Sequence, residues 1–144
     1  MDIEAKKIFW GESIGCAVIT SYLALHCPVS LFPEKVVFAA PFFSLKETVH
    51  HMVPFPFSGL IASTVKEFDT EKNIEKLHQR NEIPNNIHFL ILHSRNDEII
   101  PFFQGKAVFA QLQKHDFDAE FSECEGGHNQ MRFQTHAIIK FLKK

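Results

Sequence analysis

The sequence has few cysteines, little net charge and no long apolar run, and each shortage excludes a class of protein. Three cysteines, Cys16, Cys27 and Cys124, are too few and odd in number for a small disulfide-stapled secreted domain. The formal net charge is −2, from 15 lysines and arginines against 17 acidic residues, which excludes a strongly basic nucleic-acid binder. No run approaches the about 18 apolar residues of a membrane span, and no signal-peptide core precedes Lys7. We expect a soluble, cytoplasmic protein with reduced thiols and with neither a nucleic-acid nor a membrane partner.

Tyrosine and tryptophan occur once each, whereas phenylalanine occurs 16 times. Apolar residues make up 45% of the chain and charged residues 22%, which is typical of a globular protein. The 144 residues suffice for a domain with a buried core, and no linker or internal repeat divides them. We expect a single domain over residues 1–144 whose core is built largely from phenyl rings.

Short apolar runs alternate with longer segments of helical period along the chain. The runs predict buried strands over residues 7–10, 35–40 and 88–93, and the alternation of residues over 118–124 predicts a half-exposed strand. Helices are predicted between Ser13 and Pro28 and over residues 69–80, 101–115 and 133–143. Strands that alternate with helices form parallel sheets through right-handed crossovers. The fold class is therefore α/β, with a mostly parallel sheet and helices on both faces.

Residues 42–65 contain Pro54, Pro56 and Gly59, so we expect irregular chain there. Four phenylalanines make this segment apolar, namely Phe42, Phe43, Phe55 and Phe57. Long loops of this kind often serve as lids or binding loops, and residues 42–57 are the best candidate for a surface that holds an acyl chain. The alternative is that these rings pack over the core.

A G-x-S-x-G motif, Gly11-Glu12-Ser13-Ile14-Gly15, lies where the first predicted strand meets the first predicted helix. In this context the motif is typical of a nucleophile elbow, a sharp turn that lifts a serine hydroxyl above the sheet. The flanking glycines allow close backbone packing at the turn. The helix N-terminus offers free N–H groups to developing negative charge. The alternative is a serine that only caps the helix after a glycine turn.

A serine nucleophile needs a base, and the base needs an orienting carboxylate. Asp97 follows the third predicted strand, and His128 follows the fourth. Both therefore lie at carboxyl ends of parallel strands, where active sites of open α/β sheets form. Ser13, Asp97 and His128 make a candidate catalytic triad in the chain order Ser, Asp, His. Glu98 adjoins Asp97 and is the alternative carboxylate.

The nine histidines raise the question of a metal site. They are scattered along the sequence, and none forms a close pair with cysteine or carboxylate at the spacing of zinc ligands. His93 ends the third predicted strand, close to the candidate site, and we expect it to be a core or supporting residue. We expect no metal and no cofactor.

Several stretches together resemble the C-terminal part of an α/β-hydrolase, close to the single-domain serine hydrolases that include the membrane-associated acyl-protein thioesterase-like proteins. These stretches stand in the family's order, and the resemblance covers about residues 7 to 142. The stretches are Trp10-Gly11-Glu12-Ser13-Ile14-Gly15, Ala40-Pro41-Phe42-Phe43-Ser44-Leu45, Phe68-Asp69-Thr70, His93-Ser94-Arg95-Asn96-Asp97-Glu98-Ile99-Ile100-Pro101 and Gly126-Gly127-His128-Asn129. The resemblance implies that Ser13 is the nucleophile, His128 the general base and Asp97 the residue that orients the base. It also implies that the backbone N–H of Ile14 forms half of the oxyanion hole. Cys16 stands where the family commonly has a second glycine.

The resemblance also implies that strands ahead of the elbow strand are missing, because only Met1 to Lys6 precede it. The loop that supplies the second oxyanion N–H in the family has no counterpart here, and loss of one such donor typically costs about 100- to 1,000-fold in rate. The strand over residues 7–10 is then a sheet edge with unpaired backbone. We expect either an N-terminally truncated, partial domain or a chain that completes itself through a partner, including self-association at this edge.

Two functions stay open from the sequence. The first is a serine hydrolase that cleaves a carboxylic ester or thioester of a small-molecule or acylated substrate through an acyl-serine intermediate. The second is a catalytically impaired α/β-hydrolase fragment that acts as an interaction module or is a truncated gene product. The triad favours the first function, and the short segment ahead of residue 7 favours the second.

Overall fold

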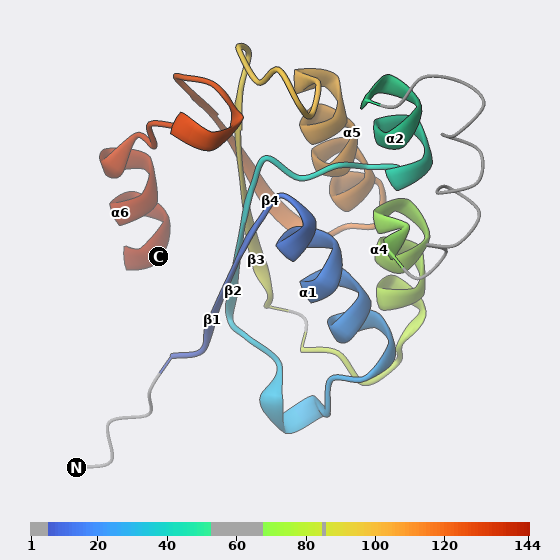
Figure 1. The fold of residues 1–144 in the computed structure, drawn as a ribbon. Coiled ribbons are helices and arrows are strands. Elements are labelled where there is room, and N and C mark those ends of the chain that lie inside the picture. The colour runs from blue at the N-terminus through green and yellow to red at the C-terminus, as the bar shows by residue number, and fades with distance from the viewer. Residues whose placement is uncertain (1–5, 53–67, 85) are drawn as a thin grey trace.

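The computed structural model describes residues 6–52, 68–84 and 86–144 (Figure 1). Its strands are β1 (Ile8–Glu12), β2 (Lys35–Ala39), β3 (His88–Ser94) and β4 (Asp118–Cys124). Its helices are α1 (Ile14–Leu25), α2 (Leu45–Met52), α4 (Thr70–Gln79), α5 (Phe102–Lys114) and α6 (Thr135–Lys143), with short 3-10 helices η1 (Val29–Leu31) and η3 (His128–Gln130). Every predicted strand and helix is present, with ends shifted by a few residues. Within this described part of the chain, no helix combines the length and hydrophobicity that a membrane crossing needs.

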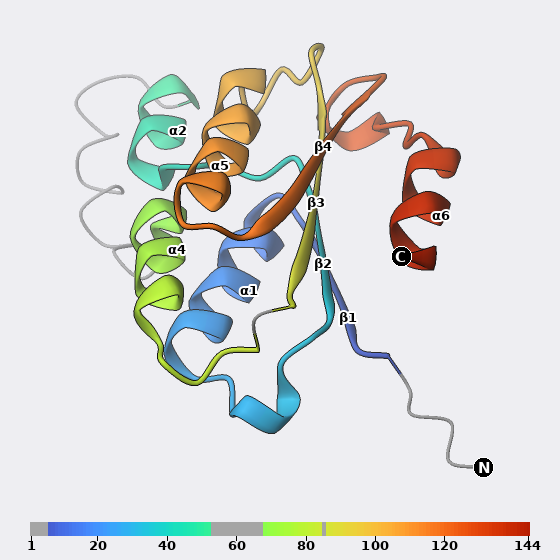
Figure 2. The ribbon, with the colours of Figure 1, turned by 180° about the vertical axis from the view of Figure 1, so that it is seen from behind.

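The four strands form one parallel sheet in the order β1-β2-β3-β4. The register aligns Trp10 with Val37, Val37 with Leu90, and Leu90 with Glu120. Each strand lies beside the one before it in sequence, so every right-handed crossover passes over the same face of the sheet. Helices α1, α4 and α5 accordingly lie together on one face, and α6 covers the other (Figure 2). The predicted α/β class, with a parallel sheet and helices on both faces, is confirmed.

The alternation of side chains along β2 divides the core into two layers. Val36 and Phe38 belong to a larger cluster beneath α1, α4 and α5, whereas Val37 and Ala39 belong to a smaller cluster covered by Phe141 of α6. In the larger cluster, phenyl rings from neighbouring segments lie 5.5 to 5.9 Å apart, as the pairs Phe38–Phe89 and Phe89–Phe117 show. Both faces of the central strands β2 and β3 are therefore buried, which explains why their sequences are continuous apolar runs.

The structure differs from the sequence prediction over residues 42–65. Leu45–Met52 form helix α2, where we predicted irregular chain. This part of the segment has neither proline nor glycine, and Ser44 lies at its start, where the hydroxyl oxygen accepts the Glu47 N–H at 3.4 Å. The residues that suggested irregular chain, Pro54, Pro56 and Gly59, lie outside the described residues.

The described phenylalanines of the proposed acyl-chain surface are core residues. Phe42 is only 3% exposed and packs with Ala17 and Ile100. Phe43 packs against the larger core cluster. These contacts favour the alternative, in which the rings cover the core, for both residues. Phe55 and Phe57 lie outside the described residues.

β1 forms one edge of the sheet, as predicted. The Lys7 carbonyl accepts the Glu34 N–H, and the Ser13 N–H donates to Ala39, so the odd-numbered residues of β1 direct their backbone groups toward β2. The backbone groups of the even-numbered residues then face outward. Two apolar side chains of β1 are exposed, Ile8 by 43% and Trp10 by 44%. Pairing of this edge with another chain stays a prediction.

The exposed edge leads us to expect concentration-dependent self-association. An antiparallel pairing of β1 with its copy that sets Ile8 opposite Trp10 also sets Lys6 opposite Glu12, so charge favours this register. We expect Trp10→Lys, which places a charge on the edge, to shift the sedimentation coefficient toward that of a monomer. Phe103→Lys is the matched control, because Phe103 is 59% exposed on α5, which contacts β3 and β4. An unaltered chain that sediments as a monomer at every concentration would contradict the prediction.

Candidate active site

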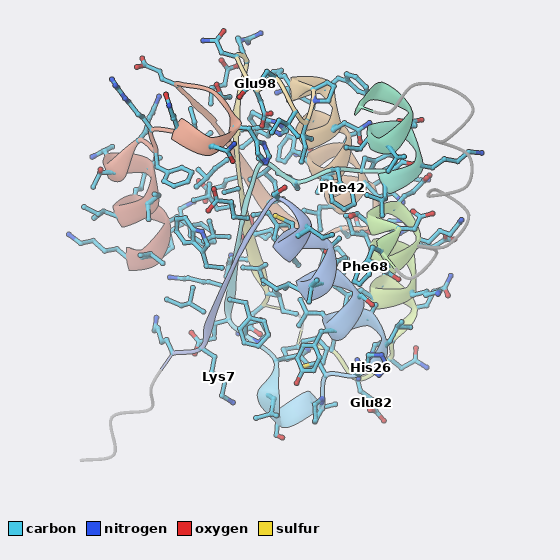
Figure 3. The ribbon with its side chains drawn as sticks, in the orientation of Figure 1. Lys7, His26, Phe42, Phe68, Glu82 and Glu98 are labelled. Atoms are coloured by element: carbon cyan, nitrogen blue, oxygen red, sulfur yellow. The ribbon has the colours of Figure 1, made fainter. Side chains whose placement is uncertain are left out.

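The carboxyl ends of β1, β3 and β4 lie at the same end of the sheet, and a candidate residue follows each of them. Ser13 follows β1, Asp97 follows β3, and His128 begins the 3-10 helix after β4. Glu98, the neighbour of Asp97, is labelled at this end in Figure 3, and Lys7 is labelled at the opposite end. The parallel sheet thus brings the side chains that the sequence singled out to one place.

Ser13 occupies the sharp turn between β1 and α1. Its backbone has φ 52° and ψ −120°, a conformation that costs a residue other than glycine about 1–3 kcal/mol. Its N–H donates to the Ala39 carbonyl at 2.8 Å, which ties the turn to β2. Gly11 is required at the turn, because a Cβ there would lie 2.8 Å from the backbone nitrogen of Cys16. This is the geometry of a nucleophile elbow.

The second glycine of the motif, Gly15, has a different environment. A Cβ at Gly15 would meet no described atom within 4 Å. The sequence predicts that both flanking glycines allow close packing. Among the described residues, this is right for Gly11 and wrong for Gly15.

Ser13, His128 and Asp97 form a continuous hydrogen-bond chain. The Ser13 Oγ lies 3.1 Å from His128 Nε2, and His128 Nδ1 lies 2.8 Å from Asp97 Oδ2. An ionised carboxylate can only accept, so Nδ1 carries the proton and Nε2 presents its lone pair to the serine hydroxyl. The Asp97 side chain is completely buried, and that of His128 is 8% exposed. This arrangement allows the imidazole to take the serine proton.

The buried Asp97 carboxylate has donors on both oxygens. Oδ1 accepts the N–H groups of Ile99 at 3.0 Å and Ile100 at 2.8 Å, and Oδ2 faces the imidazoles of His128 and His93. Burial by itself raises the pKa of Asp97, but the hydrogen bonds from these donors together lower that pKa from 3.8 to about 2. Asp97 is therefore ionised at neutral pH and holds the imidazole in the tautomer that a general base needs.

The first turn of α1 begins directly after Ser13. As the first residues of a helix, Ile14 and Gly15 have N–H groups without partners inside the helix. The Cys16 N–H, in contrast, donates to the Ser13 carbonyl at 3.1 Å. The predicted oxyanion donor, the Ile14 N–H, thus lies in the turn adjacent to the candidate nucleophile and at the positive end of the helix dipole.

Glu98 has a role that the sequence did not reveal. We weighed it as an alternative to Asp97, but its Oε2 accepts the backbone N–H of His128 at 3.0 Å, not an imidazole N–H. Gly127 allows this contact, because a Cβ there would lie 2.6 Å from the same oxygen. Gly126, with φ +90°, turns the chain just before it. Glu98 therefore holds the loop that carries His128, and only the folded chain shows that contact.

The three cysteines have unreactive environments. Cys16, Cys27 and Cys124 are free and buried. Burial raises the pKa of Cys124 to about 11 and raises that of Cys16 further, so both thiols stay protonated at neutral pH. Among the described residues, no group of three or more histidine, cysteine or acidic side chains could hold a metal ion.

Comparison with solved structures defines the class of this fold. The chain superposes on an α/β-hydrolase from Vibrio vulnificus with a TM-score of 0.63 and 20% identity, over 94% of this chain and 46% of that one. It superposes on a lipase/esterase from Lactobacillus plantarum with a TM-score of 0.62 and 10% identity, over 94% of this chain and 55% of that one. The chain therefore shares the α/β-hydrolase fold with these structures, which confirms the resemblance at the level of the fold.

Sequence comparison gives particular relatives, although no protein-family model matches the chain. The chain is 28% identical over 127 residues to uncharacterized protein R595 of Acanthamoeba polyphaga mimivirus, which is 83% of this chain and 41% of that protein. It is also 28% identical over 107 residues to lysophosphatidylserine lipase ABHD12 of Gallus gallus, which is 69% of this chain and 27% of the lipase. The chain thus spans less than half the length of these curated relatives.

The two motif glycines make a matched pair of stability predictions. We expect Gly11→Ala to lower the free energy of unfolding by about 1–3 kcal/mol, because its Cβ would overlap backbone atoms that cannot move independently. We expect Gly15→Ala to change it by less than about 1 kcal/mol, with a stabilising sign, since alanine is the better helix former. Urea unfolding of both variants measures the difference, and equal destabilisation of the two would refute the assignment of the elbow.

The lowered pKa of Asp97 predicts an acid-dependent contribution to stability. The folded pKa of about 2 lies below the unfolded value of 3.8, so the contribution is present above about pH 4 and is lost as the pH falls toward 2. We expect the difference in unfolding free energy between the unaltered chain and Asp97→Asn to shrink across this window, as measured by urea unfolding at each pH. Glu82→Gln, which removes an exposed carboxylate at the opposite end of the molecule, is the control. A difference that stays constant across the window would contradict the prediction.

Proposed function

We propose that this chain is a serine hydrolase that cleaves a carboxylic ester or thioester through an acyl-serine intermediate. The observation that carries the proposal is the hydrogen-bond chain from Ser13 through His128 to Asp97, with Ser13 held at a strained strand-to-helix turn. Local strain in a buried framework commonly marks a functional residue. The three groups fit the roles of nucleophile, general base and orienting acid.

In the first half of the reaction, Ser13 Oγ attacks the acyl carbon while His128 Nε2 takes the hydroxyl proton. The tetrahedral oxyanion accepts a hydrogen bond from the Ile14 N–H. When the intermediate collapses, the bond to the leaving group breaks, and the alcohol or thiol leaves with the proton from His128.

In the second half, a water molecule gives its proton to His128 and its oxygen attacks the acyl carbon. The acyl–Ser13 bond then breaks, the carboxylic acid leaves, and the serine oxygen takes back the proton. Asp97 keeps its charge throughout and stabilises the imidazolium that forms in each half.

The comparisons support an ester as the bond that is cleaved. Relatives by sequence include lysophosphatidylserine lipases, and relatives by structure include esterases and a lipase/esterase. The substrate class that we propose is therefore a small acylated molecule. Cleavage of a thioester rests on the sequence resemblance alone.

The exposed β1 edge favours a second candidate function. An edge strand with free backbone groups and exposed Ile8 and Trp10 is suited to pairing with another polypeptide. A chain whose main role is such an interaction would keep the triad geometry and yet turn over substrate slowly or not at all. Activity measurements separate the two candidates.

A fluorophosphonate probe, which reacts with activated serines, tests the proposal. We expect the unaltered chain to be labelled and to hydrolyse a short p-nitrophenyl ester, and we expect Ser13→Ala to lose both reactions because its nucleophile is gone. Ser30→Ala is the matched control, since Ser30 is exposed at the opposite end of the sheet. A folded, unaltered chain that neither labels nor hydrolyses would favour the interaction module, and undiminished labelling of Ser13→Ala would refute the proposed nucleophile.

A further inference from the structure

His93 is a completely buried imidazole beside the candidate triad. It lies near the end of β3, and its side chain has no exposed surface. Its Nε2 lies 2.9 Å from the Ile100 carbonyl oxygen and 3.4 Å from Asp97 Oδ2. Neither contact is needed for the proton transfer between Ser13 and His128, so the proposed mechanism leaves His93 without a role.

The surroundings of His93 fix one tautomer. Both groups near Nε2 are acceptors, so this nitrogen carries the proton. Its Nδ1 is buried and has no hydrogen-bond partner in the described part of the chain. On that side the ring is packed against the α5 backbone, because a Cβ at Gly105 would lie only 2.1 Å from Nδ1. A second proton on Nδ1 would therefore find no acceptor there, and a neutral ring with its N–H toward Ile100 and Asp97 fits the site.

The backbone of Ile100 forms a second, indirect connection between His93 and the Asp97 carboxylate. Its carbonyl accepts from His93, while its N–H donates to Asp97 Oδ1 at 2.8 Å. The direct approach of His93 is to Oδ2, the same oxygen that accepts from His128. His93 therefore constrains both oxygens of the carboxylate. It contacts Oδ2 directly, and it acts on Oδ1 through the backbone of Ile100.

We propose that His93 is a positioning residue that holds the Asp97 carboxylate in line with His128, because its Nε2–H donates to the Ile100 carbonyl and lies beside that carboxylate, with Nε2 3.4 Å from Oδ2. This inference rests on the proposed function and deepens it. A carboxylate held in this way stabilises the imidazolium of His128 better than one that can rotate, because charge stabilisation depends on a preorganised geometry.

Gly105 supports the same assignment from another element. It lies within α5, where glycine is a poor helix former and alanine would be favoured on propensity alone. The His93 ring occupies the space that an alanine Cβ would need. The absence of a side chain at this position is thus explained by the imidazole that packs against it.

His93→Leu and His93→Gln form the test pair. Leucine fills the space without a donor, whereas glutamine can place its amide nitrogen near the position of Nε2. For His93→Leu we expect fluorophosphonate labelling to slow by about 10- to 100-fold, the loss that a hydrogen bond to a charged group commonly carries. We also expect the pH midpoint of labelling to fall, because a less firmly held carboxylate stabilises protonated His128 less well. We expect His93→Gln to keep most of the labelling rate and the pH midpoint of labelling of the unaltered chain.

Gly105→Ala and His88→Leu complete the design. Gly105→Ala should displace the His93 ring and reproduce the effects of His93→Leu, although alanine favours the helix. His88→Leu removes a histidine from the other end of β3, where the ring contacts Asp118, and should leave rate and midpoint unchanged. If His93→Leu does not fold, the labelling rate and midpoint of Gly105→Ala test the positioning role of His93 instead.

Titration of the His128 ring resonances by NMR measures the pH midpoint of His128 directly, so this readout does not depend on fluorophosphonate labelling. An unaltered chain that is not labelled would refute the proposed function, whereas a lower His128 midpoint in His93→Leu or Gly105→Ala would still support the positioning role. A folded His93→Leu variant whose His128 midpoint is unchanged or raised would overturn it. Equal effects of leucine and glutamine at position 93 would also overturn it, because they would show that only packing matters.

Discussion

The buried negative charge of Asp97 is the constraint on which the rest of this end of the molecule depends. A carboxylate removed from water without partners costs several kcal/mol, so its donors must be supplied by the protein. They come from the loop after β3, from His128 after β4 and from His93 within β3. The loop, the imidazole and the strand end are therefore fixed together. A structure that keeps Asp97 ionised and buried also keeps the His128 imidazole in the orientation that the proposed general base needs.

The strained turn at Ser13 is held by a different part of the fold. Its positive φ persists because the Ser13 N–H is bonded to Ala39 of β2 and because Gly11 lets the start of α1 approach β1 closely. Backbone hydrogen bonds and close packing thus position Ser13, the proposed nucleophile, whereas a buried charge positions the His128 imidazole, the proposed base. The two halves meet at the contact of 3.1 Å between Ser13 Oγ and His128 Nε2, and Ala17 of α1 also packs with Ile100 of the loop after Asp97.

The sequence predicts those features that depend on local pattern and chain order. Three apolar runs and one alternating segment indicate the strands, and the parallel arrangement then places Ser13, Asp97 and His128 at one end of the sheet. The roles of Glu98, His93 and Gly105 depend on contacts between separate loops, strands and helices, which spacing along the chain does not encode. Helix α2 was not predicted, because Pro54 and Pro56 later in the segment indicated irregular chain, although the short stretch Leu45–Met52 contains no proline. The partial coverage of the relatives, likewise, emerges only from comparison.

The place of β1 in the sheet couples the nucleophile to the edge of the fold. Ser13 directly follows β1, whose one neighbour among the described strands is β2, whereas β3, which leads to Asp97, has a neighbour on each side. Edge strands open locally at a lower free energy than central strands do. Opening of β1 would release the Ser13–Ala39 hydrogen bond and relax the elbow, while the His128–Asp97 pair would keep its geometry. We therefore expect a strand that paired with the β1 edge to stabilise the turn at Ser13 without contacting His128, so that the predicted edge pairing and the proposed reactivity of Ser13 would be linked.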